Sequence, residues 1–170
     1  MLGDRLAGRA ISGAPYRQHR LADAFALIGW GVCQAERRSG IARGRITRWL
    51  KGDPADRAFL DWIGQLAALH GRLASPLSPA VTTDSNRPPL GPYEITLARL
   101  TIGWSERQLA ERSGEHRTTL RRLAAGGMTG DRKIGRWLEL LADGHRTWPR
   151  PHPDQLEDYP VATDQPNRCL

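Results

Sequence analysis

Apolar residues recur along much of the chain at intervals of three and four, the spacing of one face of an α-helix. In residues 19–28 they fall at Leu21, Ala24, Phe25 and Ile28. We see no stretch with the strict alternation of apolar and polar residues that indicates a strand, so the pattern predicts an all-α protein. The expected helices are at about 19–28, 32–38, 42–50 and 56–70, and again at about 93–102, 105–112, 116–125 and 130–143.

The two groups of expected helices share sequence at a constant offset of 74 residues. Residues 28–52 and 102–126 match without a gap at ten of 25 positions. In each, Ile-Gly-Trp is followed by Gln, by Arg-Ser-Gly, by two further Arg and by a final Gly. Such self-similarity indicates one structural unit, of about 50 residues, used twice. Beyond the matched window, we pair apolar positions at the same offset: Leu60 with Ile134, Ile63 with Trp137, and Leu66 with Leu140.

Segments without helical spacing separate and flank these groups. Residues 74–92 are rich in Pro, Ser and Thr and predict an extended linker. Residues 1–18 predict a flexible basic arm, and the Pro-rich residues 145–170 predict a disordered tail. The sequence therefore predicts two small helical domains, at 19–73 and 93–144.

The charge of the chain narrows the class of partner. The net charge is +7 and the pI is about 10.4, which favours polyanions such as nucleic acid or an anionic membrane surface. No apolar run approaches the 18 residues of a membrane span, and the N-terminus lacks the apolar core of a signal peptide. Two cysteines, Cys33 and Cys169, make no disulfide framework, which favours a reducing cytoplasm.

Each repeat contains a short helix, a turn with Gly, and a second short helix. Two helices that cross steeply need a small side chain where they meet, and the turn needs a residue that tolerates positive φ. Ser105 suits the N-cap of the first short helix in the second repeat. The second repeat supplies Ala110, Gly114, Leu120 and Leu123, and the first supplies Gly40, Ile46 and Trp49.

The stretch GWSERQLAERSGEHRTTLRRLAAG, residues 103–126, resembles the helix-turn-helix of the lambda/Cro repressor-like (XRE) family, and residues 29–52 resemble it more weakly. Two glutamates depart from the family pattern. Glu36 stands where the family has a small residue, and Glu115 stands where it has a buried aliphatic, as Ile41 does in the first repeat. Burying a lone carboxylate costs several kcal/mol. We therefore expect both to turn outward or to find an arginine, unless the unit is distorted.

The resemblance implies which side chains reach DNA, because in such domains the start of the second helix enters the major groove. Arg can grip O6 and N7 of guanine, and Thr can contact a thymine methyl group or a phosphate. The implied base-reading residues are Arg117, Thr118, Arg121 and Arg122 in the second repeat and Arg43, Thr47 and Arg48 in the first, where Gly44 offers no side chain. The candidates for phosphate contacts are Gln34, Gln108, Arg107, His116 and Lys51.

Motifs of catalysis and of cofactor or metal binding are missing from the sequence. It has no Gly-rich phosphate loop, nucleophile elbow or paired-carboxylate motif, so we expect no enzyme and no cofactor. His145 and His152 have no Cys or carboxylate cluster beside them, so we expect no metal site. His70 is isolated in the sequence. Trp30 and Trp104 are expected to cap the core and not to stack on bases.

The sequence thus predicts a transcriptional regulator that binds double-stranded DNA in the cytoplasm, at the nucleoid. Its two units would read adjacent, unlike half-sites about 34 Å apart, with the second repeat dominating discrimination. One alternative is a protein-interaction module, such as a phage or mobile-element regulator or inhibitor that binds itself or another regulator. The other is a non-specific protein that coats the chromosome.

Overall fold

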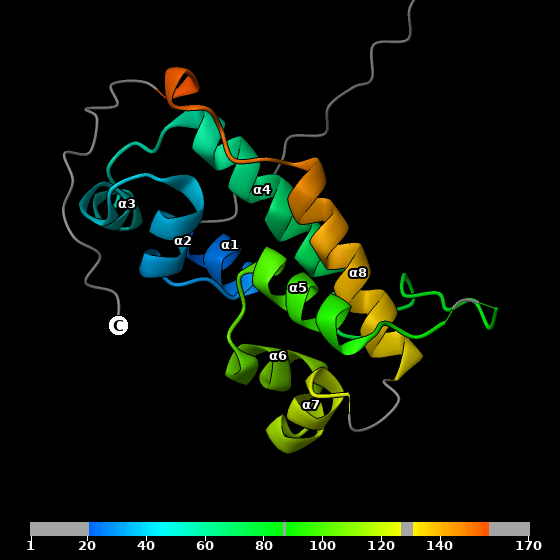
Figure 1. The fold of residues 1–170 in the computed structure, drawn as a ribbon. Coiled ribbons are helices and arrows are strands. Elements are labelled where there is room, and N and C mark those ends of the chain that lie inside the picture. The colour runs from blue at the N-terminus through cyan, green and yellow to red at the C-terminus, as the bar shows by residue number, and fades with distance from the viewer. Residues whose placement is uncertain (1–20, 87, 127–130, 157–170) are drawn as a thin grey trace, which may run out of the picture.

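A computed structural model describes residues 21–86, 88–126 and 131–156 (Figure 1). Every regular element in these residues is helical, which confirms the predicted all-α class. The first repeat contains α1 (Leu21–Ile28), α2 (Val32–Ser39), α3 (Arg43–Leu50) and α4 (Arg57–Arg72). The second contains α5 (Pro92–Ile102), α6 (Glu106–Ser113), α7 (Arg117–Ala124) and α8 (Arg132–Thr147), and a short 3₁₀ helix, η1, covers Pro153–Gln155.

The helix boundaries follow the sequence repeat. The pairs α2/α6 and α3/α7 begin and end 74 residues apart, and α1 and α5 end 74 residues apart. At the C-terminus of α2 and of α6, Gly40 and Gly114 both have φ of 76°, a left-handed conformation that favours glycine. The expected N-cap at α6 is also present, because Ser105 Oγ accepts a hydrogen bond from Gln108 N (3.2 Å).

The repeat shifts by one residue before its last helix. α4 and α8 begin and end 75 residues apart, and their N-caps, Asp56 and Asp131, share this offset. The apolar pairs expected at an offset of 74 in this region are therefore wrong by one residue. The corrected pairs include Trp62 with Trp137, Ile63 with Leu138, Leu66 with Leu141, and His70 with His145.

Each repeat builds a hydrophobic core, and each core takes residues from the other repeat. α1 packs against α4 and α5 against α8, while α4 and α8 lie side by side (Figure 1). Leu69 and Leu73, at the end of α4, belong to the core of the second repeat. Trp148, at the end of α8, packs on both cores. The two repeats are therefore joined through their cores.

The segment between the repeats is folded in part. Val81 N donates a hydrogen bond to Ser78 O (2.9 Å) in a turn, and the Val81 side chain is buried in the core of the second repeat. The extended linker expected over residues 74–92 is therefore wrong for this part, because Val81 gains more from burial than from hydration.

The C-terminal segment also packs. α8 continues to Thr147, and Leu156 is buried in the core of the first repeat. The disordered tail expected from residue 145 is thus wrong for residues 145–156. The basic arm at 1–18 and the rest of the tail, 157–170, lie outside the described residues.

The repeated tryptophans form reciprocal hydrogen bonds between the repeats. Trp30 Nε1 donates to Ile102 O (3.0 Å), and Trp104 Nε1 donates to Ile28 O (2.7 Å). Both indoles are buried, which confirms that they belong to the interior. Because each bond is the image of the other under the repeat, the two units meet with approximate twofold symmetry.

The repeated arginines follow the same symmetry. Arg112 donates from Nη1 to Leu27 O (2.7 Å) and from Nη2 to Ala26 O (2.6 Å), at the C-terminal end of α1. Arg38 Nη2 donates to Thr101 O (2.5 Å), at the C-terminal end of α5. A helix C-terminus carries partial negative charge and unpaired carbonyl groups, so a guanidinium there satisfies both.

The interface between α4 and α8 is reciprocal too. Trp62 Nε1 donates to Trp148 O (2.9 Å), and Trp137 Nε1 donates to Leu73 O (2.6 Å). His70 and His145 correspond to each other in the two repeats and are in direct contact, with their Nε2 atoms 3.0 Å apart. The pseudo-twofold axis therefore passes close to these two imidazoles.

Candidate nucleic-acid interface

The α7 helix buries one face and exposes the other. Leu120 and Leu123 are buried in the second core. The predicted base-reading residues of this repeat lie on the opposite side, and all four are exposed: Arg117, Thr118, Arg121 and Arg122. The helix therefore presents a cationic face in the arrangement expected from the sequence.

The α3 helix exposes fewer unengaged polar side chains than α7 does. Ile46 and Trp49 are buried, while Arg43, Gly44 and Arg48 are exposed. Thr47 is half-buried, and its Oγ1 donates to Arg43 O (2.8 Å), so this hydroxyl is already engaged within the helix. Arg48 lies 3.9 Å from the Asp53 carboxylate. The first repeat thus offers fewer side chains to a ligand.

The two glutamates that depart from the family pattern are both accommodated at the surface. Glu36 is half-buried, and its Oε1 accepts a hydrogen bond from Arg43 N (2.9 Å), at the first residue of α3. It thereby satisfies a backbone donor that the N-cap residue Ala42 cannot reach with a side chain. Glu115 is also only half-buried, whereas Ile41 at the matching position is fully buried.

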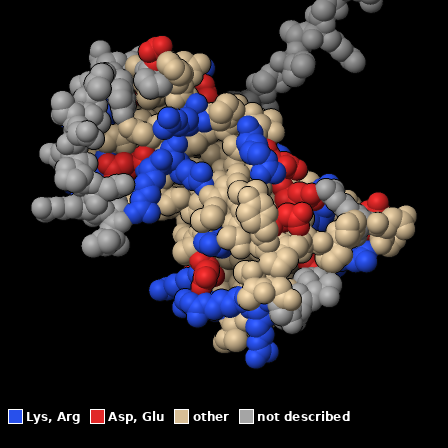
Figure 2. All heavy atoms as spheres, viewed as in Figure 1, with Lys and Arg blue, Asp and Glu red and all other residues tan. Residues whose placement is uncertain are grey.

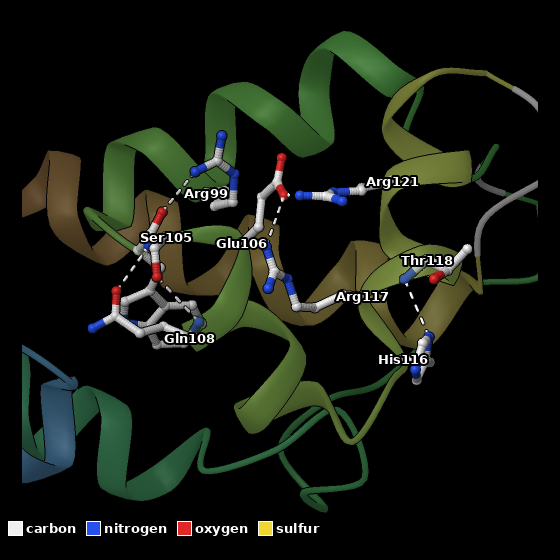
Figure 3. A network of polar contacts seen from close by, with 9 residues as sticks. Arg99, Ser105, Glu106, Gln108, His116, Arg117, Thr118 and Arg121 are labelled. Atoms are coloured by element: carbon white, nitrogen blue, oxygen red, sulfur yellow. Dashed lines mark hydrogen bonds and ion pairs between the residues drawn. The ribbon is translucent and has the colours of Figure 1, made fainter.

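Glu106, the first residue of α6, lies between two of the arginines of α7 (Figure 3). Its Oε2 accepts a hydrogen bond from Arg121 Nε (2.8 Å) and lies 3.9 Å from Arg117 Nη2. The Arg121 hydrogen bond, followed by the charges of Arg121, Arg99 and Arg117, lowers the pKa of Glu106. Sequence reasoning missed this residue, because only the packing of α6 on α7 brings positions 106 and 121 together.

The structure places two of the predicted phosphate contacts, Gln34 and Gln108, against the other repeat. Gln108 Nε2 donates to Gly29 O (2.5 Å) in the other repeat. Gln34 Nε2 lies close to Gly103, because a Cβ atom added at Gly103 would be 2.3 Å from this nitrogen. Both amides are therefore held between the repeats. Their recurrence in the sequence reflects the reciprocal interface.

The other phosphate candidates lie at the surface. Arg107 Nε donates to Glu111 Oε1 (2.8 Å), which raises the pKa of Arg107. His116 is the N-cap of α7, where its Nδ1 accepts a hydrogen bond from Thr118 N (3.3 Å). Lys51 is exposed just after α3. These three remain accessible to a ligand.

Basic residues gather in two regions of the face seen in Figure 2. One group of Lys and Arg lies over α6 and α7, at the lower end of the view, and the other lies over the first repeat, at upper left, while acidic residues are more numerous toward α8. In the described residues no helix is long and apolar enough to cross a membrane. The same part of the chain holds no group of three or more His, Cys, Asp or Glu that could hold a metal ion.

The geometry therefore consists of two cationic helices, α3 and α7, held by one reciprocal interface. Comparison with known proteins adds no relative: no family model, curated protein or solved structure matches the chain.

Proposed function

We propose that this protein binds double-stranded DNA sequence-specifically and regulates transcription, with α2–α3 and α6–α7 acting as two helix-turn-helix units of the lambda/Cro repressor-like kind. α7, and more weakly α3, would enter successive turns of the major groove. Their exposed arginines would read guanines, and Arg107, His116 and Lys51 would contact phosphates. The overall charge of +7 supports attraction to the duplex.

The observation that carries this proposal is the reciprocal interface. Dimeric proteins of this kind present two reading helices through twofold symmetry. Here the hydrogen bonds from Trp30, Trp104, Arg38 and Arg112 join the two repeats that carry α3 and α7 in a single chain. The interface, and not the length of the connecting segment, would therefore set the spacing of the half-sites. Since the two helices differ at their exposed positions, the half-sites would be unlike.

Selection of bound sequences from a random DNA pool at physiological salt tests the proposal. We expect enrichment of a site with two different half-sites, centred about one helical turn apart, and an affinity that falls as salt is raised. Enrichment of no sequence, with equal affinity for all DNA, would instead indicate a protein that coats DNA without reading it. Failure to bind DNA at any salt concentration would overturn the proposal.

A second candidate is a protein-interaction module, and the acidic residue on the cationic face favours it. Glu106 neutralises part of the charge of Arg117 and Arg121, and Gly44 removes a side chain from α3. Such a face could bind a regulator protein with mixed charge. This function predicts a selection experiment without enriched DNA.

A further inference from the structure

We propose that Glu106 is a positioning residue for DNA recognition, which holds Arg117 and Arg121 in the orientation that reads the second half-site. The inference rests on the proposed DNA binding. It assigns sequence discrimination at this half-site to a carboxylate that does not itself need to contact a base.

The contacts show why one carboxylate can orient two arginines. Arg117 and Arg121 lie one turn apart on α7, so their side chains leave the helix on the same side. Glu106 Oε2 accepts from Arg121 Nε at 2.8 Å and lies 3.9 Å from Arg117 Nη2. Figure 3 shows both guanidinium groups converging on this carboxylate from α7.

The arginines keep donors for a base after this contact. A guanidinium has five N–H donors in a planar fork. Glu106 uses the Nε donor of Arg121, so both Nη groups of that side chain remain for O6 and N7 of guanine. A long arginine loses much rotamer freedom when it binds, and a side chain that is already oriented loses less.

The position of Glu106 is itself fixed from the other repeat. Ser105 N donates to Gln108 Oε1 (2.8 Å), and Ser105 Oγ accepts from Gln108 N, so the start of α6 is closed on both sides. The same Gln108 side chain donates from Nε2 to Gly29 O in the first repeat. The reciprocal interface is thus continuous with the first turn of the helix that carries Glu106.

The positions equivalent to Glu106 and Arg121 in the first repeat cannot form the same contact. At the offset of 74, Val32 occupies the position of Glu106, and Thr47 occupies that of Arg121. Val32 has no acceptor in its side chain, and the Thr47 hydroxyl donates to Arg43 O within α3. The Glu106–Arg121 contact is therefore specific to the second repeat, which would dominate discrimination.

The Glu106 carboxylate should have two opposite effects on DNA binding. It repels phosphates, so its removal should strengthen binding to random DNA. It orients the arginines, so its removal should weaken discrimination. A residue that acts only through its charge would change the affinity for specific and random DNA by the same factor.

The test uses the full chain with Glu106→Gln and, as a matched control, Glu111→Gln. Glu111 lies on the same helix, pairs with Arg107 at 2.8 Å and carries the same charge. For Glu106→Gln we expect tighter binding to random DNA and a specific-to-random affinity ratio about tenfold lower than that of the wild type. For Glu111→Gln we expect both affinities to rise and the ratio to stay constant.

Equal changes of the ratio in the two variants, or no change in either, would overturn the role of Glu106 while leaving DNA binding in place. Wild-type protein that shows no preference for any sequence would overturn both this role and the proposed function. The side chains of Glu106 and Glu111 are 45% and 58% exposed, and we expect both variants to melt at the wild-type temperature.

Discussion

At the scale of single residues, glycines decide how closely the repeats approach. Gly29 and Gly103 have φ of 81° and 86°, and each faces the arginine of the other repeat. A Cβ atom at Gly29 would lie 2.7 Å from Arg112 Nε. Near the pseudo-twofold axis, a Cβ atom at Gly144 would lie 2.2 Å from Leu69 Cδ2, although the two positions correspond under the repeat. A single chain can place a large residue on one side of its axis and glycine on the other, which identical subunits cannot do.

Replacement of Gly103 by Ala should therefore destabilise the fold, by about 1–2 kcal/mol, because a left-handed φ strains alanine and the ends of the Gln34 and Arg38 side chains must move away from the new Cβ atom. Gly44→Ala provides the control, since Gly44 lies inside α3 with no atom within 4 Å of the added Cβ. There we expect a gain of about 0.5–1 kcal/mol. Urea denaturation measures both, and a similar change in the two variants would contradict the account.

At the scale of elements, α3 and α7 each bury apolar side chains on one face and expose polar side chains on the other. The apolar anchors Leu120 and Leu123 fix α7 on its core, and the residues between them carry the exposed arginines. Because the anchors are three residues apart, the opposite face is continuous over the helix. The two units thus differ in the side chains they expose, while their helix lengths agree.

Loss of an arginine from α7 should affect specific binding more than non-specific binding. We expect Arg117→Ala to weaken binding to the selected site by about 1–3 kcal/mol and to relax the preference at one base pair. Arg57→Ala removes the same charge from α4, where the side chain is 91% exposed and pairs only loosely with Asp61. Titration of both variants against the selected and scrambled sites should show a small and even loss for Arg57→Ala. If Arg57→Ala also weakened binding to the selected site more than to the scrambled site, Arg117 would not be a base-reading residue.

At the scale of the whole molecule, the repeats form one body through reciprocal contacts. Leu69 and Leu73 of the first repeat belong to the core of the second, and Leu156, which follows the second repeat, belongs to the core of the first. In the described residues, four indole N–H groups donate hydrogen bonds across the interface. Stability should therefore depend little on the covalent connection between the repeats.

A protease site inserted after Thr82, in an exposed stretch, should be cleaved without separating the halves. We expect the nicked protein to elute from size-exclusion chromatography as one species and to bind the selected site as the intact chain does. Dissociation should require denaturant. Elution of two fragments in native buffer would show that the connection, and not the interface, holds the repeats together.

The pair His70 and His145 makes the interface sensitive to acid. Burial, followed by the charge of Arg38, lowers the pKa of His145 to about 4. Burial, then His145 and Arg112, lowers the pKa of His70 well below its usual value. Below the ordinary pKa of 6.5 the unfolded chain binds more protons than the folded one, so stability falls as the pH drops from about 6.5 toward 4.

For His145 alone, this loss is on the order of 3 kcal/mol across that window. Denaturation at a series of pH values between 4 and 7 should show the decline, and His145→Gln should flatten it. An unchanged slope in this variant would contradict the role of the pair. At neutral pH both imidazoles are uncharged, and one donates its Nε2 proton to the other.

The sequence by itself determined the helices and their repetition, because those features depend on local physics. Apolar spacing located every α-helix of the described residues within a few residues, and Gly40, Gly114 and Ser105 marked helix ends through local φ and capping preferences. The exposed face of α7 also followed from its two leucine anchors. The DNA-reading role of that face remains a prediction.

Only the tertiary structure decided why the identities exist. The Trp, Gln and Arg positions repeat because their side chains contact the backbone of the other repeat, 72 to 85 residues away in the hydrogen bonds from Trp30, Trp104, Gln108 and Arg112. The order of residues in the sequence does not show which distant segments come together. The burial of Leu156 in the core of the first repeat arises in the same way, and the contact of Glu106 with Arg121 depends on the packing of α6 against α7. The energies of these features come from contacts between segments that are separate in the sequence, which form only when the chain has folded.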